Sequence, residues 1–319
     1  MVDDPTLYVL TGPTAVGKTE ISIQWAEAFE AEIVSCDSLL FYRGMNIGTA
    51  KPDLSERSRV THHLIDVAEV DEPLDIRRYL ELAQQAVADI QGRSRRVLVC
   101  GGSGFYLRSF FEPVTDETHV PEMIRSEVED QLAREGLPVL VADLERINPE
   151  GLGSLDTQNP RRVVRALERC RASGLTLSEL RDAMFKQTNA LIRSSKVAVR
   201  LDRDRADLND RILCRVHAML EMGLVEEVRN LLARGIDRNP SAFRAVGYRE
   251  TIRWLSRSEP IDQLVDAIAT STRRLVRKQR GWFRNQMPPH RVVSLQDGGV
   301  FSVSELFEPE SPSGAIAIP

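Results

Sequence analysis

Short, largely apolar runs alternate with segments of helical periodicity along the N-terminal part of the chain. Residues 7–10, 31–36 and 96–100 have the length and composition expected of buried strands. Apolar residues recur every three or four positions from residue 75 to residue 91, which predicts an amphipathic helix. Another helix is predicted between Thr19 and Phe29, because no proline or glycine interrupts that stretch. Strands that alternate with helices predict an α/β fold with a parallel sheet, whose ligand site lies at the carboxyl ends of its strands.

The pattern changes in the middle of the chain. Residues 38–52 contain two glycines and a proline with little periodicity, which predicts a long functional loop with at most one helical turn. Residues 62–67 are interpreted as a short strand. From about residue 116 to residue 195 the pattern is helical without a convincing strand, and Pro160 is placed at a helix start. This stretch is predicted to be a helical insertion.

The C-terminal part returns to the earlier alternation. Residues 196–201 predict a strand, and Asp207 or Asn209 is expected to cap the helix that follows. Further helix is predicted up to Gly235 and from Pro260 to about residue 285, and a last strand at residues 290–295. The predicted domains are an α/β core of residues 1–115 and 196–296, a helical insertion of residues 116–195, and a flexible tail of residues 297–319.

A glycine-rich motif separates the first predicted strand from the first helix. It fits the pattern G-x-x-x-x-G-K-[ST] and comprises Gly12, Pro13, Thr14, Ala15, Val16, Gly17, Lys18 and Thr19. Its glycines let backbone N–H groups turn inward, and the helix N-terminus adds unpaired donors. Lys18 is placed to reach a terminal phosphate, and Thr19 to offer its hydroxyl to Mg²⁺. The predicted fold class is therefore a P-loop NTPase-like parallel sheet flanked by helices; the motif alone leaves the phosphate compound open.

The composition limits the partners and the location of the protein. The formal net charge of −5 over 319 residues means that any nucleic-acid site has to be a local basic patch. The four cysteines form no C-x-x-C pair, which argues against a zinc cluster and agrees with free thiols in a reducing cytosol. The N-terminus lacks an apolar signal core, and no apolar run reaches membrane-spanning length. We therefore expect a cytoplasmic protein without a membrane segment.

Two further features lie at predicted strand ends. Asp37 follows the second strand, where it is interpreted as a Mg²⁺-linked acid, as a general base, or as a helix N-cap, with the three alternatives left open. Gly101-Gly102-Ser103-Gly104 is a second glycine turn, in which the Ser103 hydroxyl can bond a phosphate oxygen. An ordinary strand-to-helix turn explains this second motif about equally well.

The third feature is a basic stretch near the C-terminus. Between Ala267 and Gln296 there is no Asp or Glu, whereas arginines and a lysine recur there with Trp282 and Phe283 among them. Basic residues interleaved with aromatic ones are typical of nucleic-acid contacts, and the alternative is a solvated helix face. Smaller clusters comprise Arg161, Arg162 and Arg165, and Arg244, Arg249 and Arg253 around Gly247-Tyr248.

Taken together, these motifs resemble the tRNA dimethylallyltransferase (tRNA isopentenyltransferase) family. The resemblance covers nearly the whole chain, from about Leu7 to Arg284. The stretches that carry it are GPTAVGKT at 12–19, DSLLFYRGMNIGTAKP at 37–52, GGSGFYL at 101–107, NPRRVVRALE at 159–168, AVGYRE at 245–250 and TRRLVRKQRGWFR at 272–284. Members transfer a dimethylallyl group from its diphosphate to N6 of the adenine just 3′ of the anticodon. No counterpart of the C-terminal zinc finger found in some members is present, since no cysteine follows Cys214.

The resemblance implies a role for each motif. The P-loop would hold dimethylallyl diphosphate rather than ATP, with Mg²⁺ on the leaving diphosphate, and Lys18 would join the catalytic residues. Asp37 resembles the family's general base, and Ser103 stands where the family usually has Thr. Arg211 or Arg215 would add positive charge at the diphosphate, and the sequence does not decide between them. The implied tRNA contacts are Asp37, Ser38, Leu39, Leu40, Ser103, Arg125, Arg161, Arg162, Arg165, Arg244, Gly247, Tyr248, Arg249, Arg277, Lys278, Arg280, Trp282 and Arg284.

Two other functions compete with this interpretation. A P-loop small-molecule kinase would use the same loop for ATP, but this function leaves the basic stretch near the C-terminus unexplained. A noncatalytic RNA-binding protein that uses a nucleotide as a switch leaves Asp37 and the second glycine turn without a purpose. The resemblance implies dimethylallyl diphosphate and the tRNA anticodon stem-loop as partners, and we expect a monomer.

Overall fold

The computed structural model describes residues 6–116, 118–257, 259–295 and 302–308. The chain divides into two compact units, which are treated separately below: one consists of the chain up to Phe111 and from Arg193 onward, the other of Glu112–Ile192. We call the first the core unit and the second the helical unit. The sequence placed the same two transitions near residues 116 and 195.

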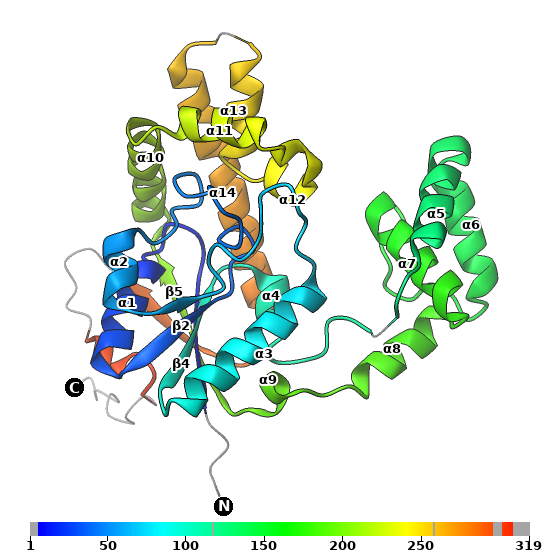
Figure 1. The fold of residues 1–319 in the computed structure, drawn as a ribbon, viewed down its shortest axis with the longest axis horizontal. Coiled ribbons are helices and arrows are strands. Elements are labelled where there is room, and N and C mark those ends of the chain that lie inside the picture. Colours follow the sequence, from blue (N-terminus) through cyan, green and yellow to red (C-terminus); the bar gives the residue numbers. More distant parts are fainter. Residues whose placement is uncertain (1–5, 117, 258, 296–301, 309–319) are drawn as a thin grey trace, which may run out of the picture. The chain divides into compact units, whose positions relative to one another are not determined.

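A six-stranded parallel sheet forms the centre of the core unit (Figure 1). The strand order is β3-β2-β4-β1-β5-β6, and all pairings are parallel. Most residues of the inner strands are fully buried, which explains their continuous apolar runs. The predicted α/β class with a parallel sheet is confirmed. The strands are β1 Leu7–Thr11, β2 Ala31–Ser35, β3 His62–His63, β4 Arg96–Gly101, β5 Lys196–Arg203 and β6 Arg291–Leu295.

Helices surround this sheet and extend the core unit beyond it. The helix α3 matches its predicted range, and Asp75 caps it by accepting a hydrogen bond from Arg78 N. The long helix α14 packs against α10 and α13 and also contacts α4. The helices are α1 Lys18–Ala28, α2 Leu54–Arg59, α3 Ile76–Gly92, α4 Gly104–Arg108, α10 Arg205–Glu221, α11 Leu224–Ala233, α12 Pro240–Phe243, α13 Tyr248–Leu255 and α14 Ile261–Gln286, with 3₁₀ turns η1 Ile236–Arg238 and η2 Val303–Glu305.

The described residues of the helical unit contain no strand, as predicted. Its helices are α5 Glu122–Glu135, α6 Leu137–Ile147, α7 Pro160–Ser173, α8 Leu177–Phe185 and the start of α9 Ala190–Arg193. Pro160 occupies the first turn of α7, where its missing N–H costs nothing, and Asn159 caps that helix. Buried residues such as Val128, Leu144 and Leu167 give the unit a hydrophobic core of its own.

Two local predictions differ from the structure, namely the cap of α10 and the length of the strand after residue 62. Asp204, rather than Asp207 or Asn209, caps α10, because the Asp207 carboxylate is paired with Arg203 instead. The further helix predicted up to Gly235 is present as α11, which begins after Gly223. The strand expected at 62–67 is limited to β3, since left-handed backbone follows it. The loop predicted at residues 38–52 is present and consists largely of turns, without a helix.

The tail was predicted to be flexible, and residues 302–308 contradict that prediction. Leu306 and Phe307 are buried, and Phe307 lies edge-on to Trp25 with ring centroids 4.9 Å apart. These residues complete the apolar cluster around β1 and α1. Residues 297–301 and 309–319 lie outside the described part of the chain.

Candidate active site

The predicted phosphate-binding loop is present between β1 and α1. Gly12 has φ +151°, and a Cβ at this position would lie 2.6 Å from the carbonyl oxygen of Leu201. Only glycine is compatible with both constraints. Gly17, also left-handed, precedes the first turn of α1 and leaves the helix N-terminus open toward the loop. The strand–glycine loop–helix arrangement therefore supplies backbone donors and a helix dipole at one point, as anion binding requires.

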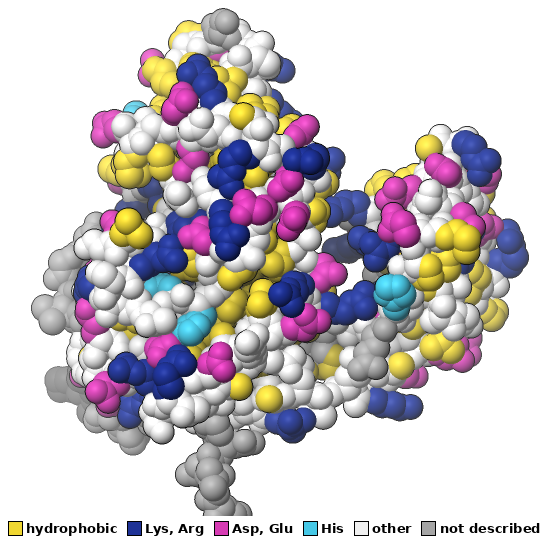
Figure 2. Space-filling view, viewed as in Figure 1, with side chains coloured by type: hydrophobic (Ala, Val, Ile, Leu, Met, Phe, Trp, Pro, Cys, Tyr) yellow, Lys and Arg dark blue, Asp and Glu magenta, His cyan; other side chains and the backbone are white. Residues whose placement is uncertain are grey.

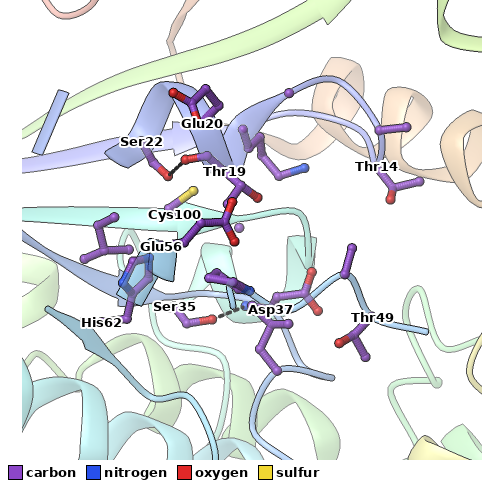
Figure 3. Close-up of a pocket in the computed structure, with 18 of the residues that line it drawn as sticks. Thr14, Thr19, Glu20, Ser22, Ser35, Asp37, Thr49, Glu56, His62 and Cys100 are labelled. Carbon is purple, nitrogen blue, oxygen red and sulfur yellow. Dashed lines mark hydrogen bonds between the residues drawn. The ribbon is translucent and has the colours of Figure 1, made fainter. Parts of the chain in front are cut away.

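A pocket of about 430 Å³ opens at this end of the sheet. Its walls combine the phosphate loop, the ends of β2 and β4, the loop after β2, and α10. Figure 3 shows Asp37 and Thr49 on one side of the space and Thr14 and Thr19 on the other. The lining residues that had been predicted as site residues are Thr14, Ala15, Gly17, Lys18, Thr19, Asp37, Leu40, Arg211 and Arg215.

Lys18 is a half-buried cation of this pocket. Its Nζ donates to the carbonyl oxygens of Gly12 and Pro13, both at 2.9 Å. Burial lowers the pKa of Lys18 below its ordinary value, while the nearby Cys100 and Asp37 act in the opposite direction. The ammonium group therefore stands within the phosphate loop, in the pocket that Asp37 also lines.

Both arginines that the sequence left as alternatives reach the phosphate loop from α10. Arg211 Nε donates to the Ala15 carbonyl at 2.9 Å, and Arg215 Nη1 donates to the Thr14 hydroxyl at 3.3 Å. Arg215 is the more deeply placed of the two, and burial lowers its pKa. Both Arg211 and Arg215 therefore contact the phosphate loop, so the structure does not require a choice between them.

Two residues of this region were missed by the sequence reasoning. Arg203, at the end of β5, donates through Nε to the Val16 carbonyl at 2.9 Å and pairs with Asp207. Gln279 on α14 contacts Thr14 N and the Gly102 carbonyl. Each joins the loop to a segment more than a hundred residues away along the chain, and no local motif signals such a contact.

Asp37 lies just beyond β2 and faces the pocket. Its Oδ1 accepts a hydrogen bond from Leu39 N at 3.1 Å, and its own N–H donates to Ser35 Oγ at 3.4 Å (Figure 3). No helix begins after Asp37 among the described residues 38–52, so the N-cap alternative is excluded. Asp37 is a carboxylate held by a turn in the same pocket as the Lys18 ammonium. This arrangement is compatible with a general base and with a Mg²⁺-linked acid.

The second glycine turn follows β4 beside Asp37. A Cβ at Gly101 would collide with the Cys36 carbonyl, so glycine is required there for close approach. Ser103 Oγ accepts from Ser38 N at 3.1 Å and lies 3.3 Å from Ser38 Oγ. Ser103 therefore joins the two loops that carry Asp37 and the second glycine turn.

The basic stretch of α14 has an exposed side and a packed side. Arg277, Lys278 and Arg284 are exposed, as a nucleic-acid contact requires. Arg280 instead forms an ion pair with Asp202 at 2.6 Å, and the ring of Trp282 packs against Gly104. These last two residues were predicted as tRNA contacts, and the structure gives them packing roles. On the face seen in Figure 2, basic side chains are interspersed with acidic ones, in keeping with the acidic composition.

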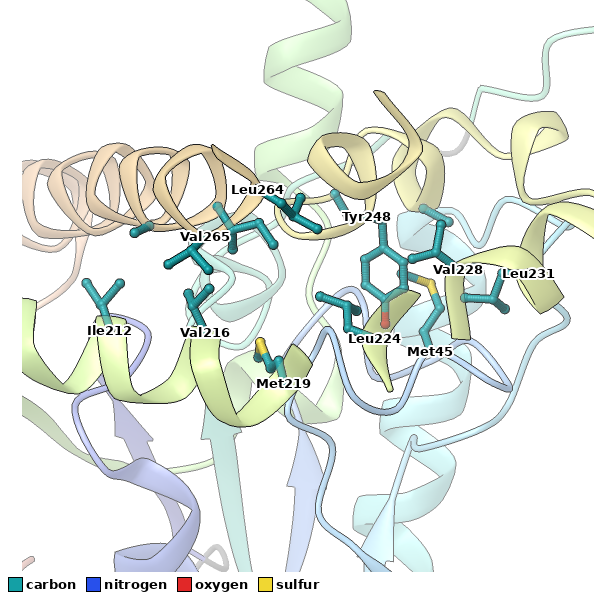
Figure 4. Packing of buried hydrophobic residues seen from close by; sticks show 14 of the residues in the cluster. Met45, Ile212, Val216, Met219, Leu224, Val228, Leu231, Tyr248, Leu264 and Val265 are labelled. Atoms are coloured by element: carbon teal, nitrogen blue, oxygen red, sulfur yellow. The ribbon is translucent and has the colours of Figure 1, made fainter. Parts of the chain in front are cut away.

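The segment around Gly247 and Tyr248 also differs from its predicted role. Tyr248 is fully buried among α11, α13 and α14, where it lies close to Met45 and Leu224 (Figure 4). Its hydroxyl donates to Glu227 at 2.7 Å, and Gly247 N donates to Glu250. Arg249 is paired with Glu250, whereas Arg244 is exposed. Tyr248 therefore belongs to the core and presents no surface to RNA.

The arginines predicted in the helical unit have mixed surroundings. Arg161 and Arg162 are exposed at the start of α7, and Arg165 pairs with Glu168 at 2.8 Å. The Nε of Arg125 on α5 is buried without a hydrogen-bond partner. Exposed guanidinium groups near the N-terminus of a helix are available to phosphate oxygens.

The described residues contain neither a preformed metal cluster nor a membrane-spanning helix. No cluster of three or more His, Cys, Asp or Glu side chains with metal-binding geometry is found there. The pocket nevertheless has the oxygen donors that Mg²⁺ uses when most of its ligands are water and phosphate, with Thr19 and Asp37 on its wall. In the same residues no helix has both the length and the apolar character needed to cross a bilayer.

The chain is similar to known proteins over most of its length. The family model described as IPP transferase matches residues 40–286. The tRNA dimethylallyltransferase of Opitutus terrae is 53% identical over 303 residues, which cover 94% of this chain and 97% of that protein. That of Salinispora arenicola is 40% identical over 298 residues, covering 92% and 83%.

Solved structures give the same picture. The tRNA isopentenylpyrophosphate transferase of Bacillus halodurans superposes with a TM-score of 0.66 at 30% identity, covering 95% of this chain and 93% of that one. A eukaryotic dimethylallyltransferase solved acting on tRNA, at 24% identity, has a TM-score of 0.79 and covers 91% and 74%. This last likeness concerns the fold.

Proposed function

Since the chain belongs to the tRNA dimethylallyltransferase family, we propose that it moves a dimethylallyl group from dimethylallyl diphosphate to N6 of an adenine in tRNA. The acceptor is the adenine 3′-adjacent to the anticodon, and diphosphate is released. One observation carries this proposal: the Asp37 carboxylate lines the same pocket as the phosphate loop and Lys18.

The cations of the pocket are suited to a diphosphate leaving group. Lys18, Arg211 and Arg215 all line the space in front of the loop. Positive charge held in place before the reaction stabilises the charge that develops on the diphosphate as its bond to carbon breaks. Mg²⁺ bound through Thr19 and phosphate oxygens would neutralise part of the same charge.

Asp37 is proposed as the general base. The N6 lone pair attacks C1 of the dimethylallyl group, the C1–oxygen bond breaks, and its electron pair leaves with the diphosphate. The proton lost from N6 passes to the Asp37 carboxylate. The Leu39 N–H that bonds Asp37 Oδ1 keeps one carboxylate oxygen in place and leaves the other for this proton. The adenine has to leave its stack to reach the pocket.

The exposed basic side chains of α14 are proposed to contact the tRNA backbone. Arg277, Lys278 and Arg284 share the exposed side of that helix, while its packed side contacts the loops of the pocket. Such contacts supply affinity that depends on salt concentration and carry no base specificity.

Two labelled donors separate this function from the kinase alternative. The protein is incubated with tRNA and either dimethylallyl diphosphate labelled in the prenyl group or ATP labelled in its γ-phosphate. Label in tRNA from the prenyl donor alone supports the proposal, and nuclease digestion locates it on the adenine. Label transferred from ATP to a small molecule, with none entering tRNA, would make the protein a kinase.

A further inference from the structure

The phosphate loop and the second glycine turn leave the sheet from neighbouring strands. The β1–β4 ladder pairs Thr11 with Gly101, and the Thr11 hydroxyl donates to the Gly101 carbonyl at 2.7 Å. Beyond this pair the ladder ends, and the two loops continue close together, with a Cβ at Gly102 3.2 Å from the Gly12 carbonyl oxygen. One loop carries Lys18, and the other carries Ser103, whose hydroxyl holds the segment after Asp37.

Gln279 of α14 connects these two loops just beyond the end of the ladder. Its Oε1 accepts from Thr14 N at 2.9 Å, and its Nε2 donates to the Gly102 carbonyl at 3.0 Å. The chemistry fixes this orientation of the amide, because Thr14 N is only a donor and the Gly102 carbonyl only an acceptor. An amide offers an acceptor and a donor on one planar group, whereas an ionised carboxylate of the same length offers acceptors alone.

Contacts of neighbouring residues on α14 hold Gln279 in place. The next residue, Arg280, is paired with Asp202 at the end of β5, and Trp282 packs against Gly104 of α4. A Cβ at Gly102 would lie 2.8 Å from Gln279 Nε2 and 3.5 Å from Lys18 Nζ, which shows how closely these groups converge. One turn of α14 therefore contacts the segments that follow β1 and β4 and the end of β5.

We propose that Gln279 is a positioning residue that sets the spacing between the phosphate loop and the loop carrying Ser103. This inference rests on the proposed function, in which the first loop holds the diphosphate and the second supports Asp37. If the bridge is lost, the diphosphate and the base are held independently, and C1 and N6 meet less often in the geometry needed for transfer. Displacements of about 1 Å can lower the rate of such a step about a hundredfold.

The test compares two substitutions with a matched neighbour. Gln279→Met keeps the length of the side chain and removes both hydrogen bonds, and Gln279→Glu keeps the acceptor for Thr14 N but faces the Gly102 carbonyl with a carboxylate. Lys278→Ala, on the exposed side of the same turn, is the control. Binding of inorganic pyrophosphate is measured by calorimetry, and prenyl transfer is measured by steady-state kinetics with tRNA in excess.

Both Gln279 variants are expected to bind pyrophosphate about tenfold more weakly and to lose about a hundredfold in kcat, with the affinity for tRNA within about twofold of wild type. Lys278→Ala should show the opposite pattern, with weaker tRNA binding and normal pyrophosphate binding. A folded Gln279→Met with wild-type values in both assays overturns the proposal; if that variant fails to fold, Gln279→Glu decides by the same two readouts. A wild-type protein that binds pyrophosphate but transfers no prenyl group would refute the proposed function instead. The pyrophosphate affinities of the Gln279 variants would still test whether Gln279 positions the phosphate loop.

Discussion

Replacing Glu227 with alanine should loosen a wall of the active site and lower the stability of the core unit. The Glu227 carboxylate, on α11, accepts from three consecutive backbone N–H groups of the loop after β2: Asn46 at 3.0 Å, Ile47 at 2.7 Å and Gly48 at 3.1 Å. It also accepts from the buried Tyr248 hydroxyl at 2.7 Å. The residues that follow this anchored segment, including Thr49 and Ala50, line the pocket.

The size of the effect follows from what each donor loses. The three N–H groups lie near the surface, where water replaces much of a hydrogen bond, whereas the Tyr248 hydroxyl is buried and left without its acceptor. A bond to a charged group contributes about 1.5–3 kcal/mol, and an unsatisfied buried group costs about 1–3 kcal/mol. Since these contributions are not independent, we expect a total of about 2–4 kcal/mol, equivalent to roughly 4–16 °C in Tm for a unit of this size.

Thermal unfolding followed by circular dichroism measures this shift, and the chain supplies its own control. Glu226 lies next to Glu227 on the same helix, is exposed, and pairs only with Arg229 at 3.3 Å in the described structure. Glu226→Ala should change the free energy of unfolding by no more than about 0.5 kcal/mol.

A double-mutant cycle with Tyr248→Phe isolates the contact between the two side chains. That variant alone should cost about 1 kcal/mol, and less in the Glu227→Ala background, because the hydroxyl then has no acceptor to lose. If Glu227→Ala unfolds at the same temperature as Glu226→Ala, or if the Tyr248→Phe cost is the same in both backgrounds, the anchoring account is wrong.

Three further outcomes follow from the site. Asp37→Asn should abolish prenyl transfer while the affinity for tRNA, measured by filter binding, changes less than threefold or so; near-normal turnover would remove the base assignment. Arg277→Ala should weaken tRNA binding and reduce the slope of log K against log salt concentration by about 1. Arg280→Ala, which breaks the ion pair with Asp202, should lower Tm and leave that slope unchanged. Equal slopes for Arg277→Ala and wild type would favour a solvated helix face. Because burial lowers the pKa of Lys18, its positive charge is lost at a lower pH than that of an ordinary lysine as the pH rises. The kcat/KM for dimethylallyl diphosphate should therefore fall with rising pH at a lower pH than in Lys18→Arg, and coincident profiles would contradict this.

The residues that sequence reasoning located correctly are those with local signals. The phosphate loop was predictable because strand, glycine turn and helix start follow one another within a short stretch, and the structure confirms that order at Gly12–Thr19. Asp37 and Gly101 could be placed at the pocket because parallel strands direct their carboxyl ends to one edge of the sheet.

Residues that depend on distant partners were beyond that reasoning. Tyr248 sits between arginines in the sequence and resembles a surface contact, but its acceptor Glu227 comes from a different helix, 21 residues away. Gln279 lies within the basic stretch, yet its partner Thr14 is 265 residues away, and only the packing of α14 brings them together. Arg280 lies in a stretch whose basic and aromatic composition is typical of an RNA contact. Its ion pair with Asp202 could not be inferred from its neighbours in the sequence.

The central claim is that the pocket of the phosphate loop selects a prenyl diphosphate. Isothermal titration of the full chain with dimethylallyl diphosphate and, separately, with ATP, each with Mg²⁺ present, tests it most directly. The account predicts saturable one-to-one binding of dimethylallyl diphosphate that is lost in Lys18→Ala, with ATP binding weaker by a factor of ten or so. Tight binding of ATP with no detectable heat from the prenyl diphosphate would contradict it.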